Sequence, residues 1–294
     1  MLRAVRSYFE ARDYLEVQTP IAVPSPGTEV HLDAFEIGEG SSARYLITSP
    51  EYHMKRLLSG GFERVFQITK CFRRHERGSL HEPELTMLEW YQAHGTYTDL
   101  IQETENLVEF VCRHVLGRPW IDVNGMRIDL SAPWQRMSVC EAFQAYANAD
   151  ALQMAETEEP FFRTLVDQVE PHLGRDKPCF LYDYPACMAA LARLKPSDTA
   201  LAERFEAYLA GIELCNGYVE LTDAPEQRQR CHNDQLRRRA MGKLEYPLDE
   251  RFLAALEHGI PPCVGNALGL DRLVMLLAGA DKIQDVMAFS DARR

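Results

Sequence analysis

The stretch Phe72–Tyr91, FRRHERGSLHEPELTMLEWY, predicts two antiparallel strands joined by a charged loop. Residues 65–73 alternate with a period of two. One face of that strand carries Gln67, Thr69, Cys71 and Arg73, and one face of the returning strand carries Leu85, Met87, Glu89 and Tyr91. An arginine at a strand end with His81 in the loop suits an anionic, phosphate-bearing ligand. Taken alone, the hairpin is equally compatible with an exposed loop of mixed charge.

Length and composition indicate an ordinary globular protein. The 294 residues are 46% apolar and 26% charged, and the net charge of −12 gives no overall basic character to attract nucleic acid. A tRNA or DNA site would therefore need a local basic patch. The eight cysteines contain no CxxC pair, which argues against structural zinc and indicates reduced thiols in a cytoplasmic protein. We expect no signal peptide and no membrane span, because no run of about 18 apolar residues exists.

The hydrophobic pattern along the chain predicts alternating helices and strands. Helices are expected at 1–13, from Ser49-Pro50-Glu51 to Gly60-Gly61, and at 98–116, 138–147, 158–170, 225–241 and 249–258. Strands are expected at 14–20, 45–48 and 126–130, in a second hairpin at 203–223, and as a glycine-rich strand from Gly265 that leads into an apolar helix. We predict one α+β domain spanning 1–294, an antiparallel sheet flanked by helices, with 119–180 covering one sheet edge.

The second hairpin, RFEAYLAGIELCNGYVELTD, is rich in acidic residues. A turn centred on Leu209-Ala210 would place Glu206 directly opposite Glu213. Two facing carboxylates repel each other unless a cation lies between them, and oxygen ligands suit magnesium carried by a nucleotide. An exposed strand pair with unpaired acids is the alternative.

The strand after Glu213 has a face out of phase with that residue. Asn216, Tyr218 and Glu220 share this face, so one common site would require a bulge between 213 and 216. The tail segment GNALGLDRLVMLL, residues 265–277, fits neither GxGxxG nor a P-loop. On its own it is compatible with a close-packed strand–helix junction in which Asp271 caps the helix.

Several motifs nevertheless occur in a recognisable order. TP at 19–20, FR…H.PE at 72–84 and GLDR at 269–272 resemble the three signature motifs of class II aminoacyl-tRNA synthetases. The lysyl type is the nearest match, through SPE at 49–51, the run ending at Tyr91, RFE at 204–206 and E..NG..EL.D from Glu213. The resemblance covers nearly the whole chain, and several motifs at compatible spacing are far more specific than any one of them.

Two features narrow the resemblance further. Only 13 residues precede Tyr14, which leaves no room for the anticodon-binding domain of a lysyl-tRNA synthetase, and Ala267 stands where those enzymes typically carry glycine. The chain resembles truncated paralogues, the elongation factor P–(R)-β-lysine ligase family. This resemblance implies ATP- and Mg²⁺-dependent activation of (R)-β-lysine, or lysine, as an adenylate and its transfer to a lysine of elongation factor P. It also implies a cytoplasmic enzyme that uses no tRNA and forms a homodimer around motif-one Pro20.

The resemblance implies a role for each matching residue. Arg73 would act on the α-phosphate and Arg272 would lie over the adenine and γ-phosphate, while Glu51 would grip the substrate amine near the carboxylate. Glu220 with Tyr91 would take the ε-ammonium. The implied substrate set is Ser49, Pro50, Glu51, Tyr91, Asn216, Glu220 and Ala267. The implied ATP set is Arg73, Arg74, His75, His81, Glu82, Leu85, Glu213, Leu214, Gly269 and Arg272. The implied magnesium ligands are Glu206 and Glu213.

Three residues depart from the family pattern around the nucleotide. His75 stands at the acid of FRxE, Glu82 replaces an asparagine, and Leu85 replaces the phenylalanine that stacks on adenine. Such losses would weaken adenine binding by about 1–2 kcal/mol. Two other functions stay open: a tRNA-independent lysine-activating ligase acting on another target, and an inactive paralogue that senses a ligand or binds a partner. The basic helix at 225–241 is either a docking face for an acidic protein or a solvated surface.

Overall fold

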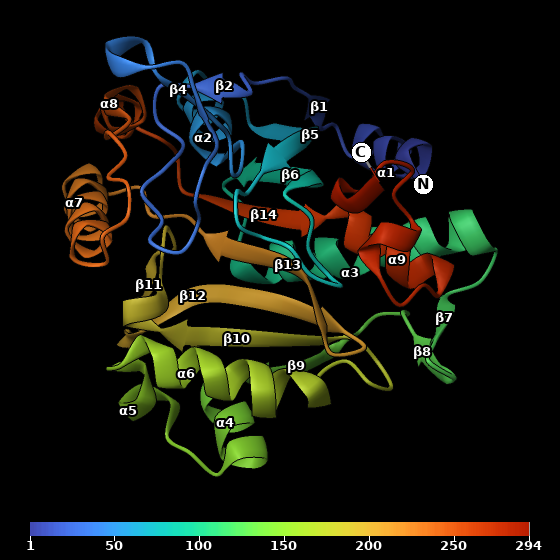
Figure 1. The fold of residues 1–294 in the computed structure, drawn as a ribbon. Coiled ribbons are helices and arrows are strands. Elements are labelled where there is room, and N and C mark those ends of the chain that lie inside the picture. The colour runs from blue at the N-terminus through green and yellow to red at the C-terminus, as the bar shows by residue number, and fades with distance from the viewer. Residues whose placement is uncertain (294) are drawn as a thin grey trace.

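A computed structural model describes residues 1–293, and its centre is a nine-stranded sheet (Figure 1). The strand order is β1 (Leu15–Glu16), β5 (Arg64–Phe72), β6 (Glu84–Ala93), β14 (Cys263–Gly269), β13 (Ile212–Val219), β12 (Asp198–Leu209), β10 (Cys179–Pro185) and β9 (Gln135–Ser138), with β11 (Leu194–Lys195) also on β12. All pairs between β5 and β10 are antiparallel, and only the outermost pairs β1–β5 and β10–β9 are parallel. The predicted α+β class is confirmed, with a sheet that is mixed at both edges.

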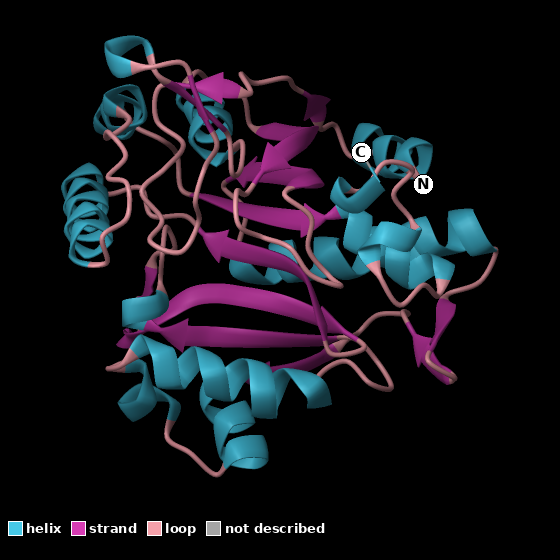
Figure 2. Cartoon of the chain, viewed as in Figure 1, coloured by secondary structure: helices cyan, strands magenta, loops and turns pink. Residues whose placement is uncertain are grey.

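Helices pack around this sheet in three groups (Figure 2). The first group shares one hydrophobic core with the sheet: α1 (Leu2–Glu10), α3 (Tyr97–Leu116) and α9 (Leu270–Ala278). The second packs near β10: α4 (Val139–Ala147), α5 (Ala151–Ala155) and α6 (Glu158–Thr164), which continues as a π-helical turn at Leu165–Val169. The third forms a separate cluster: α2 (Glu51–Ser59), α7 (Ala224–Ala240) and α8 (Glu250–His258).

Small elements complete the described chain. Two minor sheets are β2 (Ala22–Val23), β4 (Arg44–Leu46) and β3 (Glu36–Ile37), and β7 (Trp120–Val123) with β8 (Met126–Asp129). Short 3₁₀ turns lie at Gly40–Ser42, Glu170–His172, Ala186–Met188, Ile283–Asp285 and Asp291–Arg293. The predicted strand at 126–130 is therefore β8, but it pairs outside the main sheet. The stretch 119–180 does more than cover an edge, because it supplies the edge strand β9 and leads into β10.

The central hairpin follows the predicted alternation. β5 pairs with β6 from Arg64–Gln92 to Phe72–Glu84. Phe66, Leu88 and Trp90 are fully buried in the core shared with α1 and α3. The face that carries Met87, Glu89 and Tyr91 is thereby turned away from that core, as the period of two predicts.

Helix boundaries follow local capping chemistry. α3 begins with a capping box in which Thr96 and Asp99 satisfy each other's backbone amides, and it ends at left-handed Gly117. α2 begins at Glu51, one residue later than a Ser49 N-cap followed by proline implies, although the Ser49 hydroxyl still accepts from the Glu51 amide at 3.1 Å. The predicted strand at 14–20 is reduced to the two residues of β1.

The second hairpin corrects one prediction and contains the bulge that a common site would require. Its two-residue turn is Ala210-Gly211, with φ of 58° and 77°. The turn therefore lies one residue later in the chain than expected, which changes the partner of every residue in the hairpin. Glu206 pairs with Asn216, and Glu213 pairs with Tyr208, so the expectation that Glu206 faces Glu213 directly was wrong. The register then shifts, which makes Leu214 an extra residue. This is the bulge required between 213 and 216, and it returns Glu213 to the face of Glu206 and Asn216.

Substitution of Gly174 by alanine should destabilise the fold. Gly174 has φ of +68°, and an added Cβ would lie 2.4 Å from the Tyr208 backbone oxygen. Gly242 also has φ of +68° but nothing lies within 4 Å of its would-be Cβ, so Gly242→Ala is a control for backbone strain alone. We expect Gly174→Ala to lose about 1–3 kcal/mol more unfolding free energy than Gly242→Ala in urea titrations. Equal losses would contradict this packing at β12.

Candidate active site

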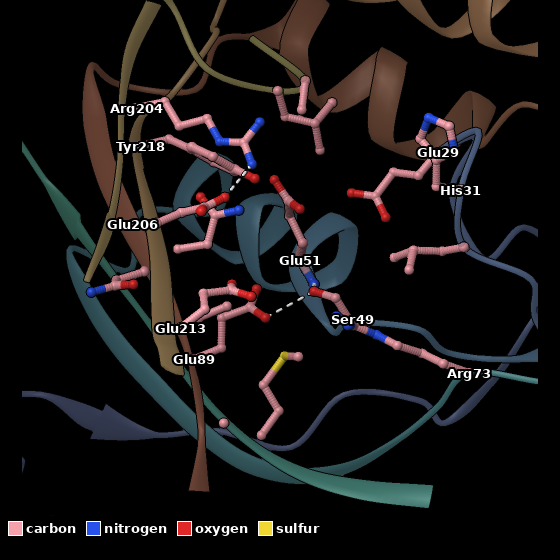
Figure 3. Close-up of a pocket in the computed structure, with 18 of the residues that line it drawn as sticks. Glu29, His31, Ser49, Glu51, Arg73, Glu89, Arg204, Glu206, Glu213 and Tyr218 are labelled. Atoms are coloured by element: carbon pink, nitrogen blue, oxygen red, sulfur yellow. Dashed lines mark hydrogen bonds and ion pairs between the residues drawn. The ribbon is translucent and has the colours of Figure 1, made fainter. Parts of the chain in front are cut away.

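One cavity of about 580 Å³ opens on the sheet face opposite α1 and α3. It is lined by β6, β12, β13, β14, the start of α2, the loop at 28–32 and the loop at 73–82 that follows β5 (Figure 3). Most residues singled out from the sequence line it. They are Ser49, Glu51, Arg73, His81, Glu82, Leu85, Tyr91, Glu206, Glu213, Leu214, Asn216, Glu220, Ala267, Gly269 and Arg272. Its volume lies within the range of small-molecule sites.

Three residues of the expected sets do not line this cavity: Pro50, Arg74 and His75. The backbone amide of Arg74 donates instead to the Asp33 carbonyl at 2.7 Å. Glu76 does line the cavity, and its carboxylate lies 3.4 Å from Arg73 Nη1. The acid that accompanies Arg73 is therefore Glu76, one residue beyond the position that His75 occupies in the motif. Roles for Arg74 and His75 in ATP binding stay predictions.

Arg272 organises the opposite wall of the site. Its Nη1 donates to the Glu213 carbonyl at 2.7 Å and pairs with the Glu213 carboxylate at 3.2 Å, and its Nη2 lies 2.7 Å from His81 Nε2. Burial opposes ionisation of Glu213, but Arg272 outweighs it and holds the pKa of Glu213 below its usual value. Burial and the same guanidinium lower the pKa of His81. A neutral His81 can then accept from Arg272, and both face the cavity.

Glu206 is held rigidly at the β12 wall. Tyr184 and Tyr208 donate to its Oε2 at 2.6 and 2.7 Å, and Arg204 donates to its Oε1 at 2.6 Å. Glu206 Oε1 and Glu213 Oε1 each retain acceptor capacity, so both fit as carboxylate ligands for magnesium. Within residues 1–293 no three His, Cys, Asp or Glu side chains form a metal-binding group. A magnesium ion here would therefore depend on phosphate oxygens as well as protein.

A buried lysine that the sequence analysis did not single out joins two predicted substrate residues. Lys55 Nζ lies 2.6 Å from Glu51 Oε1 and 2.5 Å from Glu220 Oε2, and the Lys55 side chain is 1% exposed. Burial alone would lower the pKa of Lys55, but Glu220 and Glu51 outweigh it and raise that pKa. Burial raises the pKa of Glu220. Lys55 is thus the internal cation that permits two carboxylates at this end of the cavity.

Glu89 is a second residue without a predicted role. Tyr91 donates its hydroxyl to Glu89 Oε1 at 2.6 Å. Ser49 donates to Glu89 Oε2 at 2.8 Å, the contact that Figure 3 marks with a dashed line. Burial, reinforced by nearby Glu51, raises the pKa of Glu89. The period-two face shared with Tyr91 was the signal that could have identified Glu89.

Gly265 makes space for this end of the cavity. It pairs with Tyr91 across β14 and β6. An added Cβ would lie 2.3 Å from the Tyr91 ring and 2.5 Å from Glu220 Oε1. A glycine is therefore required here by the two side chains that line the pocket, and not by a phosphate turn.

Comparison with known proteins agrees with this geometry. A family model described as tRNA synthetases class II (D, K and N) matches residues 1–293. Three curated relatives share the name elongation factor P–(R)-β-lysine ligase. The protein of Proteus mirabilis is 44% identical over 97% of this chain and 91% of its own length, that of Salmonella typhi is 43% identical over 99% and 92%, and that of Hamiltonella defensa is 42% identical over 98% and 92%.

The chain belongs to the elongation factor P–(R)-β-lysine ligase family. It carries the class II synthetase domain of that family, and it is an ATP-dependent ligase. The inactive-paralogue alternative is not favoured by these relatives. In the described residues 1–293 no helix combines the length and apolarity that crossing a bilayer requires.

Two of the departures from the lysyl-tRNA synthetase pattern have local structural explanations. Glu82 Oε1 accepts from Gln284 Nε2 at 2.8 Å, and Oε2 accepts from the Asp291 amide at 2.7 Å. Its carboxylate therefore anchors the C-terminal segment to the loop after β5. Leu85 packs with Val23, Ile47, Cys71 and Met87 at the edge of the cavity.

Asp271 does not cap α9 but accepts from the Thr86 amide at 2.5 Å.

Removal of the buried ammonium group of Lys55 should lower the unfolding free energy much more than removal of an exposed lysine. Lys55→Met leaves Glu51 and Glu220 without their shared partner, and we expect a loss of about 3–5 kcal/mol in unfolding free energy. Lys70→Met is the control, because Lys70 is 43% exposed and its pair with Glu84 at 3.5 Å is worth at most about 1 kcal/mol.

The Lys55→Met defect should also depend on pH. Burial raises the folded-state pKa of Glu220, and loss of Lys55 raises it further. A carboxyl whose pKa is higher in the folded than in the unfolded protein contributes stability to the fold at pH values below its unfolded-state pKa. That contribution is lost as the pH rises through the folded-state pKa, so the loss of stability in Lys55→Met should grow with pH. Urea midpoints for both variants at several pH values measure it. A pH-independent defect would contradict the assigned ion pair.

Proposed function

We propose that this chain activates (R)-β-lysine with ATP and transfers it to a lysine side chain of elongation factor P, as the names of its relatives describe. The observation that carries the proposal is the separation of charges within this cavity. Arg73 and Arg272 both lie close enough to Glu213 to lower its pKa, whereas the carboxylates of Glu51, Glu89 and Glu220 gather around Lys55. This arrangement suits a triphosphate beside a diamino acid.

The acidic end supports an amino acid that carries two ammonium groups. Glu51, Glu89 and Glu220 gather there, and Lys55 is the cation that pairs with two of them. Asn216 Oδ1 is also buried with no hydrogen-bond partner among the described residues. An ammonium group would satisfy these oxygens, whereas an uncharged analogue would leave them desolvated and unpaired. In the proposed roles Glu51 binds the amine near the carboxylate, and Glu220 binds the ε-ammonium.

The nucleotide end supports adenylate formation through positioning and charge neutralisation. The substrate carboxylate attacks the α-phosphorus of ATP, a new oxygen–phosphorus bond forms, and pyrophosphate leaves. Arg73 would neutralise charge at the α-phosphate, an effect worth about 3–4 kcal/mol for a donor aimed at developing charge. Arg272 and His81 would contact the distal phosphates. Magnesium, where bound by Glu206 and Glu213, would supply further neutralisation of phosphate charge.

The test is an incubation with ATP, magnesium, (R)-β-lysine and elongation factor P, followed by intact mass measurement of the acceptor. We expect elongation factor P to gain the mass of one β-lysyl group. Pyrophosphate exchange should be faster with (R)-β-lysine than with lysine, because Ala267 adds a methyl group worth about 1–3 kcal/mol to the pocket floor. A clear preference for lysine would favour the lysine-activating alternative. Absence of exchange with either amino acid would favour the inactive paralogue.

A homodimer in the cytoplasm is part of the same proposal. Pro20 of motif one lies in the segment between β1 and β2, next to Ile21, which is 41% exposed, and Leu15 in the edge strand β1 is 50% exposed. Burial of these apolar side chains against a second copy would stabilise association. Light scattering at micromolar concentration should give about twice the 33.6 kDa chain mass. A mass of one chain under these conditions would contradict the dimer.

A further inference from the structure

The transfer step of the proposed function requires removal of a proton. A lysine ε-amine has an ordinary pKa of about 10.4, so near neutral pH the acceptor arrives as an ammonium ion that has no lone pair for attack. The residues given roles above bind phosphates or substrate amines. A group that accepts the acceptor's proton must therefore be sought elsewhere along the cavity.

Most acidic groups of the cavity are already engaged. Lys55 pairs with Glu51 and Glu220, and Tyr91 and Ser49 donate to Glu89. Three more contact an arginine: Glu206 contacts Arg204, Glu213 contacts Arg272, and Glu76 contacts Arg73. Backbone amides donate to Glu82 and Asp271, and the Thr28 hydroxyl donates to Asp234 at 3.3 Å.

Glu29 differs from all of these. It lies in the loop between β2 and β3, and its side chain enters the cavity on the side facing Glu51 (Figure 3). No hydrogen bond or salt bridge joins its carboxylate to another residue in the described part of the chain, although the side chain is partly buried.

The backbone that carries Glu29 is nevertheless firmly held. The guanidinium of buried Arg238 donates to the carbonyls of Glu29 at 2.7 Å and Leu32 at 2.9 Å, and to Asp33 at 2.7 Å. Lys243 donates to the Val30 carbonyl at 3.0 Å. A fixed backbone with an unengaged carboxylate is the arrangement expected of a group that must receive a proton from an incoming substrate.

The surroundings of Glu29 also suit proton transfer near neutral pH. Burial, with repulsion from Glu51 on α2 and Asp234 on α7, raises the pKa of Glu29 to about 7, against the opposing effects of Arg73 and Arg204. A general base is most effective when its pKa is close to the working pH. An ordinary glutamate, with a pKa of about 4.3, would be a much weaker base.

We propose that Glu29 is the general base of the transfer step, accepting a proton from the acceptor lysine as its amine attacks the adenylate carbonyl. The ε-ammonium gives one proton to the Glu29 carboxylate, and the freed electron pair forms the carbon–nitrogen bond. The bond from the acyl carbon to the phosphate oxygen then breaks, and AMP leaves with that electron pair. The second nitrogen proton passes to the departing phosphate, and Glu29 returns its proton to water.

The test separates the two half-reactions in Glu29→Gln. Pyrophosphate exchange with (R)-β-lysine should keep its wild-type rate and KM, which also shows that the variant is folded. Transfer to elongation factor P should fall by about 10²–10⁴-fold. Transfer to hydroxylamine, an amine that is uncharged at neutral pH and needs no base before attack, should stay near the wild-type rate.

Two controls make the test specific. Glu158→Gln removes another carboxylate that lines the cavity, one that pairs with Arg237 and His31, and it should retain transfer to elongation factor P. Single-turnover transfer by wild type should rise with pH through about 7, where Glu29 loses its proton. In wild type and, at a reduced rate, in Glu29→Asp the rise should level off once this carboxyl is ionised, whereas in Glu29→Gln the slow rate should keep rising above pH 7 as the acceptor amine itself loses its proton.

Three results would overturn the role. The first is normal transfer to elongation factor P by Glu29→Gln, and the second is an equal loss with hydroxylamine. The third is a raised KM for (R)-β-lysine in exchange, which would make Glu29 a binding residue for the amino acid. Wild-type protein that performs no exchange at all would instead refute the proposed function on which this role rests.

Discussion

The placement of Lys55 between Glu51 and Glu220 is the constraint on which the site depends. Several buried carboxylates on one sheet face would repel each other and strongly resist desolvation. Lys55 offsets this cost from α2, one turn beyond Glu51, at 2.5–2.6 Å from both acids. The start of α2 must therefore dock over the end of β13, where Glu220 follows Val219. The SPE motif and the Glu220 strand are thus fixed by one ion-pair network.

The order of the strands in the sheet brings the other residues of the cavity together. β6, β14, β13 and β12 are neighbours in the sheet although they come from distant parts of the chain. Tyr91 therefore pairs with Gly265, Ala267 with Asn216, and Asn216 with Glu206. Because side chains at directly paired positions share a face, residues some 120 positions apart converge on one cavity. The bulge at Leu214 adds Glu213 to the same wall.

Sequence reasoning predicted the parts of the site that depend on local pattern. The period of two placed Met87, Glu89 and Tyr91 on one face, and the motif order brought Arg73 and Arg272 to one cavity. It misplaced Glu206 opposite Glu213, because a shift of one residue in the turn changes every pair in a hairpin. It overlooked Lys55 and Glu29, because a lysine in an amphipathic helix and a glutamate in a loop look solvated until long-range contacts are known. Glu76, and not His75, lines the cavity beside Arg73, and the sequence could not show which of these two neighbouring loop side chains turns inward.

The carboxylates of the cavity differ in how completely their oxygens are satisfied, and this difference assigns their chemistry. Glu206 accepts from two tyrosines and an arginine, so it is rigid and suited to hold charge in a fixed place. Glu51 and Glu220 share a single lysine, so they retain acceptor capacity for substrate ammonium groups. The Glu29 carboxylate has no hydrogen-bond or ion-pair partner within residues 1–293, and burial with repulsion from Glu51 raises its pKa to about 7. The proposed metal-binding, ammonium-binding and proton-accepting roles thus follow the order in which these carboxylates become less satisfied by protein donors.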